Sequence, residues 1–353
     1  MTREQRLNAI KVEMAKRILV LDGSMGAYLQ DFRLDGSDFH GTRFAEHPHA
    51  LKGNNDLLVL TRPDIITRVH EGYLSAGADI IETNTFSATT ISQAEYRLEE
   101  VAYELNVEGA KLARAACDKF EAQDGKPRIV AGAVGPTTKL LSMSPEVGDP
   151  GRRDCDFDTM AKAYEEQVRG LIEGGADVLL IETITDTLNA KAALWGAWEA
   201  FDALGIELPL WLSGTITDKS GRTLSGQTVE AFYNSVRHAK PMAIGLNCAL
   251  GPAEMRAFLA DLSRIAECAV LCYPNAGLPN AMGAYDETPH SMEAHYAEWA
   301  RAGLVNILGG CCGTTPEHIE HLKHALEGVA PRVIPQHETR MRLAGLEPFT
   351  AAA

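Results

Sequence analysis

No stretch of this sequence is apolar for the roughly 18–20 consecutive residues that a helix needs to span a bilayer. The first residues, Met1 to Arg6, carry mixed charge and lead directly into amphipathic sequence, so a secretory signal peptide is not expected either. These absences predict a protein without a membrane partner, located in the cytoplasm.

Positive charge is scarce: 33 Lys and Arg stand against 48 Asp and Glu, for a net charge of −15. Nucleic acids and anionic membrane surfaces are bound through a positive footprint, so both are disfavoured as partners. The remaining composition, 45% hydrophobic and 23% charged, is that of a globular protein with a large core. A chain of 353 residues can form two domains or a single α/β barrel.

Cysteine is sparse and odd in number, with seven residues, which argues against a disulfide framework. The chain has no Cys-x-x-Cys, and no Gly-x-Gly-x-x-Gly follows the first predicted strand, so neither a local zinc motif nor a dinucleotide fingerprint is present. Because a disulfide framework is not expected, metal-binding or catalytic cysteines are favoured. Cys117 falls in the middle of a predicted helix and Cys155 in a loop, whereas Cys268 and Cys272 flank or lie within a strand and are expected to fill the core.

What the chain does contain is a repeated unit of amphipathic helix, glycine, buried strand and polar residue. It is clearest at Gly77–Glu82 and Gly175–Glu182, with a weaker copy at Ala302–Leu308. Helices are expected over residues 4–17 and from Pro63 to Gly77. A recurring unit of this kind is typical of parallel β/α arrays.

Together with further apolar runs along the chain, these copies give eight predicted strands. Eight such strands favour an α/β fold of the (β/α)8 TIM-barrel type over residues 1–330. The strands are expected at Arg17–Leu21, near residue 80, at Arg128–Val134, near residue 178, and at Leu208–Ser213, Met242–Asn247, Ala269–Tyr273 and Leu304–Leu308. A doubly wound open sheet is the alternative. The proline-punctuated residues 331–353 are expected to form a tail or linker outside the barrel. Long loops are expected at 31–62, 137–157 and 275–293.

Polar and thiol side chains follow the predicted strands at their carboxyl ends, where barrel enzymes place their catalytic groups. They are Asp22, Glu82, Asn84, Glu182, Asn247, Cys248, Asn275, Cys311 and Cys312.

Cys311 and Cys312 are the most unusual of these, because they are adjacent and flanked by glycines. Neighbouring residues of a regular strand point to opposite faces, so both sulfurs reach one point only if the backbone turns there. Gly309, Gly310 and Gly313 are expected to supply the freedom for that turn. Taken alone, the pair is explained by two buried thiols or a strained vicinal disulfide as well as by a functional site.

Cys248 changes that balance, since it ends the sixth predicted strand and the cysteine pair ends the eighth. In a closed barrel these strands flank the seventh, so the three thiolates can meet. Three sulfur ligands favour zinc and leave its fourth position open, as in catalytic sites. A zinc ion with three thiolates has a formal charge of −1 and suits the binding of a substrate thiol as thiolate. The chemistry predicted is alkyl transfer to a thiol.

Asp22 and Glu182 are expected to hold a substrate ammonium group near that centre. Backbone N–H groups of the Gly23–Gly26 turn are expected to take a carboxylate. The substrate would then be a thiol-bearing amino acid. The alternatives are that Asp22 caps a helix and that Glu182 forms a structural salt bridge.

Several of these segments resemble the homocysteine S-methyltransferase family, and more closely the homocysteine-binding modules of cobalamin-dependent methionine synthases. The general likeness lies in Asp22–Gly26, Glu82–Phe86, Gly245–Cys248 and Gly309–Thr314. The closer likeness lies in Lys52–Asp56, Ser144–Gly151, Tyr273–Pro279 and Arg340–Pro348. The resemblance covers nearly the whole chain.

The resemblance implies a zinc barrel that methylates homocysteine to methionine, with Cys248, Cys311 and Cys312 as zinc ligands. It places Asp22 and Glu182 near the amino group and Asn275 as a fourth ligand or neighbour. The full set of implied substrate-binding residues is Asp22, Gly23, Ser24, Glu82, Asn84, Glu182 and Asn275.

The resemblance also implies methylcobalamin as methyl donor, supplied ultimately by 5-methyltetrahydrofolate. The chain contains no cobalamin-binding Asp-x-His-x-x-Gly, so the corrinoid and folate modules are expected on another chain, docked on the three long loops. One alternative is a corrinoid-independent methyltransferase that uses S-methylmethionine or betaine. Another is a thiol- or zinc-binding regulatory subunit without turnover.

Overall fold

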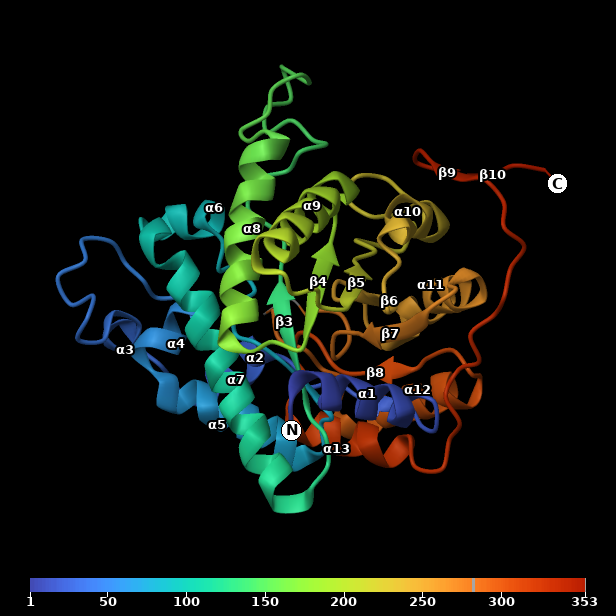
Figure 1. Cartoon of the computed structure of the whole chain (residues 1–353), viewed down its shortest axis with the longest axis horizontal. Coiled ribbons are helices and arrows are strands. Elements are labelled where there is room, and N and C mark those ends of the chain that lie inside the picture. The colour runs from blue at the N-terminus through green and yellow to red at the C-terminus, as the bar shows by residue number, and fades with distance from the viewer. Residues whose placement is uncertain (281–282, 353) are drawn as a thin grey trace.

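The computed structural model describes residues 1–280 and 283–352, and within them eight parallel strands form one sheet (Figure 1). The strands are β1 (Leu19–Val20), β2 (Ile80–Glu82), β3 (Ile129–Val134), β4 (Val178–Ile184), β5 (Leu210–Gly214), β6 (Ala243–Asn247), β7 (Ala269–Tyr273) and β8 (Ile307–Leu308). From β2 to β8 each strand pairs with the next one along the chain, and β1 pairs with β8.

The sheet closes between β1 and β2. Leu21 and Ile80 form a parallel bridge, and the Asp22 N–H donates to the Ile80 carbonyl at 3.0 Å. The predicted (β/α)8 barrel is therefore confirmed, and the open doubly wound sheet is wrong, because an open sheet would leave these strands as edges.

Helices surround the barrel and alternate with its strands. The longer ones are α5 (Pro63–Ala76), α7 (Ala102–Asp124), α8 (Phe157–Gly174), α9 (Thr187–Leu204), α10 (Val229–Val236), α11 (Pro252–Ile265), α12 (Pro289–Arg301) and α13 (Pro316–Ala325). As predicted, α5 begins at Pro63 and is ended by Gly77, whose φ of 109° only glycine adopts readily.

The interior of the barrel is apolar, and α1 (Arg3–Met14) covers the end at which the strands begin (Figure 1). Ile10 of α1 belongs to the same buried cluster as Leu19, Leu180 and Trp211 of the strands. A second apolar layer lies between the sheet and the surrounding helices. The opposite end of the barrel, toward which the strand arrows point, is left for polar groups.

The connection over residues 31–62 is less irregular than its composition predicts. It contains α3 (Gly36–His40), η1 (Asn55–Leu57) and α4 (Leu58–Thr61), after α2 (Met25–Gln30). Asp35 caps α3 by accepting from the Ser37 N–H at 2.8 Å. The next connection holds α6 (Thr90–Gln93), η2 (Ala94–Tyr96) and η3 (Glu99–Val101), and η4 (Arg237–Ala239) follows α10. Such short helices carry no apolar periodicity long enough to be read from sequence.

The repeated unit places a polar residue just before a strand, and this residue holds the neighbouring strand in register. The carboxylate of Asp79 accepts from the Val20 N–H, and that of Asp177 accepts from the Val130 N–H, both at 2.9 Å. In the weaker copy, Asn306 Oδ1 accepts from the Val270 N–H at the same distance. The repeat therefore encodes three equivalent strand junctions at one end of the barrel.

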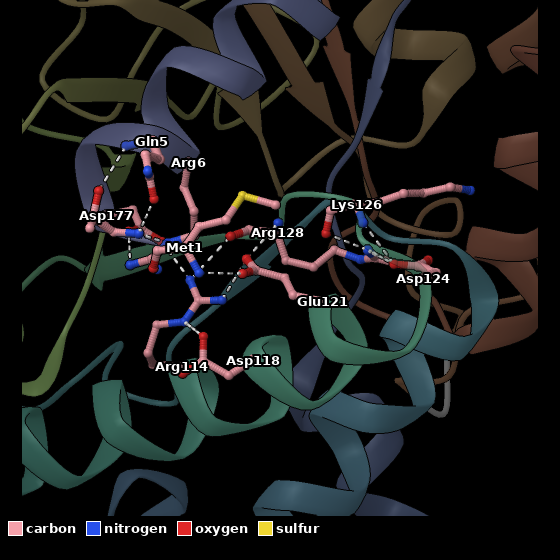
Figure 2. Close-up of polar contacts among 11 residues, drawn as sticks. Met1, Gln5, Arg6, Arg114, Asp118, Glu121, Asp124, Lys126, Arg128 and Asp177 are labelled. Atoms are coloured by element: carbon pink, nitrogen blue, oxygen red, sulfur yellow. Dashed lines mark hydrogen bonds and ion pairs between the residues drawn. The ribbon is translucent and has the colours of Figure 1, made fainter.

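Asp177 is also the centre of a buried ionic network (Figure 2). Arg6 of α1 binds it through Nε at 3.0 Å and Nη2 at 2.8 Å, and Arg114 of α7 binds it at 2.9 Å. Arg114 also donates to Glu121 at 2.9 Å. The network joins α1, α7 and β4, so it fastens the covering helix to the barrel.

The tail contains an antiparallel hairpin of β9 (Arg342–Ala344) and β10 (Pro348–Thr350), separate from the barrel sheet. It contacts α10: the Thr228 N–H donates to the Leu346 carbonyl, and Gln227 Nε2 donates to the Gly345 carbonyl. The domain boundary at residue 330 stays a prediction. In the described part of the chain, no helix combines the length and apolarity needed to cross a bilayer.

Candidate active site

Three cysteine sulfurs meet at the carboxyl end of the barrel. Cys248 Sγ lies 3.7 Å from Cys312 Sγ, which lies 4.0 Å from Cys311 Sγ, and all three sulfurs lie within 4.8 Å of one another. All three side chains are half-buried. The predicted meeting of strands β6 and β8 around β7 thus brings these thiols to one point.

The backbone around Cys248 is strained. Cys248 and Ala249 have φ values of 60° and 58°, a left-handed conformation that is costly for residues with a Cβ. Asn247, fully buried, holds this turn by accepting from Ser213 Oγ at 2.7 Å and from the Thr183 N–H at 3.1 Å. The sequence marks Asn247 only as a strand-end residue, because its partners lie on β4 and β5.

The glycines beside the cysteine pair act differently from the expectation. Only Gly313 has a left-handed φ, of 82°. Gly309 and Gly310 are needed because neighbouring groups approach closely: a Cβ on Gly309 would lie 2.8 Å from Leu21 Cβ, and one on Gly310 would lie 2.4 Å from Thr314 Oγ1. Gly309 and Gly310 are therefore required because there is no space for a side chain, and the prediction that they supply conformational freedom is wrong.

Replacing Gly310 by alanine is expected to displace the cysteine pair and to destabilise the protein by about 1–3 kcal/mol, as overpacking does. Denaturant unfolding together with a methyl-transfer assay measures both effects. Gly345→Ala is the matched control, since a Cβ there meets no atom within 4 Å. Equal stability and activity of the two variants would contradict the packing argument.

Three buried or half-buried carboxyl groups lie next to the thiols. Tyr273 donates to Glu182 Oε2 at 3.2 Å, and the Glu82 N–H donates to Asp22 Oδ2 at 3.0 Å. Burial raises the pKa of all three carboxyls, and repulsion from Glu182 adds to this for Asp22 and Glu82. For Glu182 the pKa reaches about 7. The carboxyl groups therefore hold protons at neutral pH, and a cation bound beside them would favour their ionised forms.

The two structural alternatives for these carboxylates do not hold. Ser24, not Asp22, caps α2 by accepting from the Ala27 N–H at 3.1 Å. No cationic side chain in residues 1–280 or 283–352 forms an ion pair with Glu182 or Asp22. The Asp22 Oδ1 atom is buried and has no hydrogen-bond partner there. An unpartnered oxygen in a cluster without a cation is the arrangement that an ammonium group completes.

The other predicted substrate-binding residues lie around this carboxyl cluster, and each has its own contacts. Gly23 is packed against Tyr73, and the Ser24 N–H donates to Thr314 Oγ1 at 3.1 Å, so this N–H is not available for a substrate carboxylate. Asn84 binds the Asn55 carbonyl at 2.8 Å. The Asn275 Oδ1 atom is buried without a partner, which fits its predicted place beside the thiols.

Tyr285 is a site residue that sequence reasoning missed. Its ring packs on Gly313, and its hydroxyl lies close enough to the Cys312 sulfur to help lower the pKa of Cys312. Hydrogen bonds from Cys248 and Cys311 hold the pKa of Cys312 well below its usual range, whereas the pKa of Cys311 is raised. Tyr285 lies in a loop without periodicity, so no sequence signal marks it. The cluster can therefore hold one thiolate even without a metal.

Glu182→Gln is expected to be more stable than the wild type near pH 8, by about 3 kcal/mol at 1.36 kcal/mol per pKa unit. The folded pKa of about 7 lies above the ordinary 4.5, so the native state binds more protons and loses stability as pH rises between these values. Near pH 4, below the pKa of both states, Glu182 is protonated in the folded and the unfolded protein and the advantage should vanish. Urea unfolding of the substrate-free proteins at both pH values checks this, with the exposed Glu4→Gln as control; a pH-independent difference would contradict it.

The fold and the site define a (β/α)8 barrel protein with a three-cysteine centre at the carboxyl ends of its strands. The family model described as homocysteine S-methyltransferase matches residues 19–326, and the chain belongs to this family. It is accordingly an enzyme that methylates homocysteine, as the resemblance predicted.

Solved structures agree with this fold. The oxidized form of the homocysteine methyltransferase MmuM from Escherichia coli matches with a TM-score of 0.70 and 23% identity, over 90% of this chain and 99% of that one. Its metallated form matches with a TM-score of 0.66 and 24% identity, over the same shares. At such identities the likeness concerns the fold.

Proposed function

We propose that this homocysteine S-methyltransferase binds one Zn²⁺ ion through Cys248, Cys311 and Cys312. The supporting observation is the spacing of the sulfurs. A tetrahedral centre with Zn–S bonds of about 2.3 Å needs sulfurs about 3.8 Å apart. Two of the separations in this chain are 3.7 and 4.0 Å. A zinc ion held there would supply the charge that turns a substrate thiol into a nucleophilic thiolate at neutral pH.

The carboxyl cluster would recognise the amino group of homocysteine. Asp22 offers the unpartnered Oδ1 atom, and Glu182 and Glu82 place two further carboxyl groups near it. The arriving ammonium would favour the ionised carboxylates, so the protons held there at neutral pH would leave on binding. The Asn275 Oδ1 atom would lie at the thiol centre or accept a hydrogen bond from the substrate. Glycine at position 23 leaves room for Tyr73, which supports this turn.

Tyr285 would shield the reacting sulfur. Its ring covers Gly313, and its hydroxyl contacts Cys312, so it limits the access of water to the thiol centre from that side. A desolvated thiolate is a stronger nucleophile than a hydrated one, which suits attack on a methyl carbon.

The methyl donor in this proposal is methylcobalamin carried on another chain, with 5-methyltetrahydrofolate as its source. Support comes from the segments that resemble methionine synthase modules. Residues 137–157 project from the end of the barrel that bears the site (Figure 1). Together with 31–62 and 275–293 they would form the docking surface, although residues 281–282 of the third loop lie outside the described part. The cytoplasm remains the expected location.

A donor assay tests this assignment. The zinc-loaded chain is mixed with homocysteine and either methylcobalamin, S-methylmethionine or betaine, and methionine is measured. Methylcobalamin is expected to support turnover, faster when a corrinoid-binding module carries it. Full turnover with S-methylmethionine or betaine and no corrinoid would overturn the donor and establish the corrinoid-independent alternative. No methyl transfer with any donor would favour a regulatory subunit.

A further inference from the structure

A second group of metal-ligating side chains lies outside the barrel, on α12 and α13. We propose that His290, Glu293 and His321 bind a divalent transition-metal ion of the zinc type and thereby join these two helices. The two helices pack side by side (Figure 1). None of the three cysteines takes part, so this site is separate from the thiol centre.

The donor atoms are already close to a binding geometry. His321 Nδ1 lies 2.7 Å from Glu293 Oε2, and His290 Nδ1 lies 3.7 Å from the same oxygen. One donor atom from each residue lies within 4.8 Å of the other two. Metal–ligand bonds of about 2.0–2.1 Å in a tetrahedral site separate N and O ligands by about 3.3 Å. Small side-chain rotations would therefore suffice.

An ion pair alone does not explain the positions of these three residues. His290 and Glu293 are three positions apart near the start of α12, so they share one face of the helix. His321 faces them from α13, and the rings of the two histidines lie 6.5 Å apart at 75°. A surface ion pair between Glu293 and His321 needs one histidine only. The second imidazole at the same carboxylate is what a metal ion accounts for.

The chemistry of the donors selects the class of ion. Two imidazoles and one carboxylate suit zinc, nickel and copper, whereas magnesium and calcium prefer oxygen ligands alone. His290 is 91% exposed and the other two side chains are 31% exposed. An ion can therefore enter from solvent, and a fourth position remains for water.

Binding there would reinforce the frame of the thiol centre. The segment before α12 carries Tyr285, and α13 follows the cysteine pair directly. These segments are already tied by His318, whose Nε2 lies 3.0 Å from the Glu287 carbonyl oxygen. A metal ion between α12 and α13 would add a second tie on the outside of the barrel. The expected consequence is higher thermal stability in the presence of the ion.

Calorimetric titration tests the proposal on protein already loaded with one equivalent of zinc. Added Zn²⁺ or Ni²⁺ is expected to bind as a further equivalent and to raise the melting temperature. His321→Ala and His290→Ala should each weaken this binding at least 10-fold and cancel the rise. His290 is exposed, so its variant tests binding without risk to folding. The control is His295→Ala, on another face of α12, which should bind as the wild type does.

The result that overturns the proposal is a wild type that takes up no further equivalent, or one whose further equivalent persists in both histidine variants. Cys312→Ala separates this site from the thiol centre, because it should retain the metal held by His290, Glu293 and His321. Loss of that metal in Cys312→Ala would also contradict an independent second site.

Discussion

Cys312→Ala is expected to lose zinc and at least about 100-fold in the rate of methionine formation, while its fold is kept. Cys312 contacts both other thiols, at 3.7 and 4.0 Å, so its removal opens the centre of the cluster. Loss of a group that only orients a metal ligand already lowers metal affinity or activity by about 10–100-fold, and loss of a ligand itself should lower them further. Elemental analysis, circular dichroism and a methyl-transfer assay measure the three properties.

Cys155→Ala is the matched control for this variant. Cys155 is another half-buried thiol, but it lies in a loop and donates to the Asp156 carbonyl. It should keep zinc and activity. Activity of Cys312→Ala at the wild-type level without zinc would refute the proposed metal chemistry. Loss of zinc from both variants would show that the thiol cluster alone does not hold the ion.

Asp177→Ala is expected to lower the free energy of unfolding by about 3–5 kcal/mol, the usual cost of breaking a buried ion pair from one side. Its carboxylate is fully buried and binds Arg6, Arg114 and the Val130 N–H (Figure 2). Without it, Arg6 and Arg114 would keep buried charge with fewer partners, and β3 would lose its link to β4. Urea unfolding followed by circular dichroism measures the difference.

Asp118→Ala serves as the comparison, because Asp118 binds the same Arg114 at 2.8 Å but its side chain is 56% exposed. Solvent screens such a pair, so the variant should lose less than about 1 kcal/mol. If both variants lost the same stability, the charge on Arg114 rather than the burial of Asp177 would govern the network, and the prediction would be wrong.

Much of the barrel could be predicted because its signals are local. Each strand is a short apolar run bounded by glycine or proline, and the phrase around Asp79 returns around Asp177. Strand order in a barrel follows chain order, so the placement of Cys248 two units before Cys311 was enough to bring them together. The short helices in residues 31–62 escaped prediction because they are too brief to show a period.

The sequence by itself determined the barrel, the strand ends and the residues that could meet there. Only the tertiary structure decided how they meet. Asn247 holds the Cys248 turn through β4 and β5, Tyr285 reaches Cys312 from a loop, and Gly310 is required by Thr314 rather than by its own φ. These contacts join side chains from different strands and loops. Periodicity records which face a residue takes within its own element, but not which residue of another element it will touch.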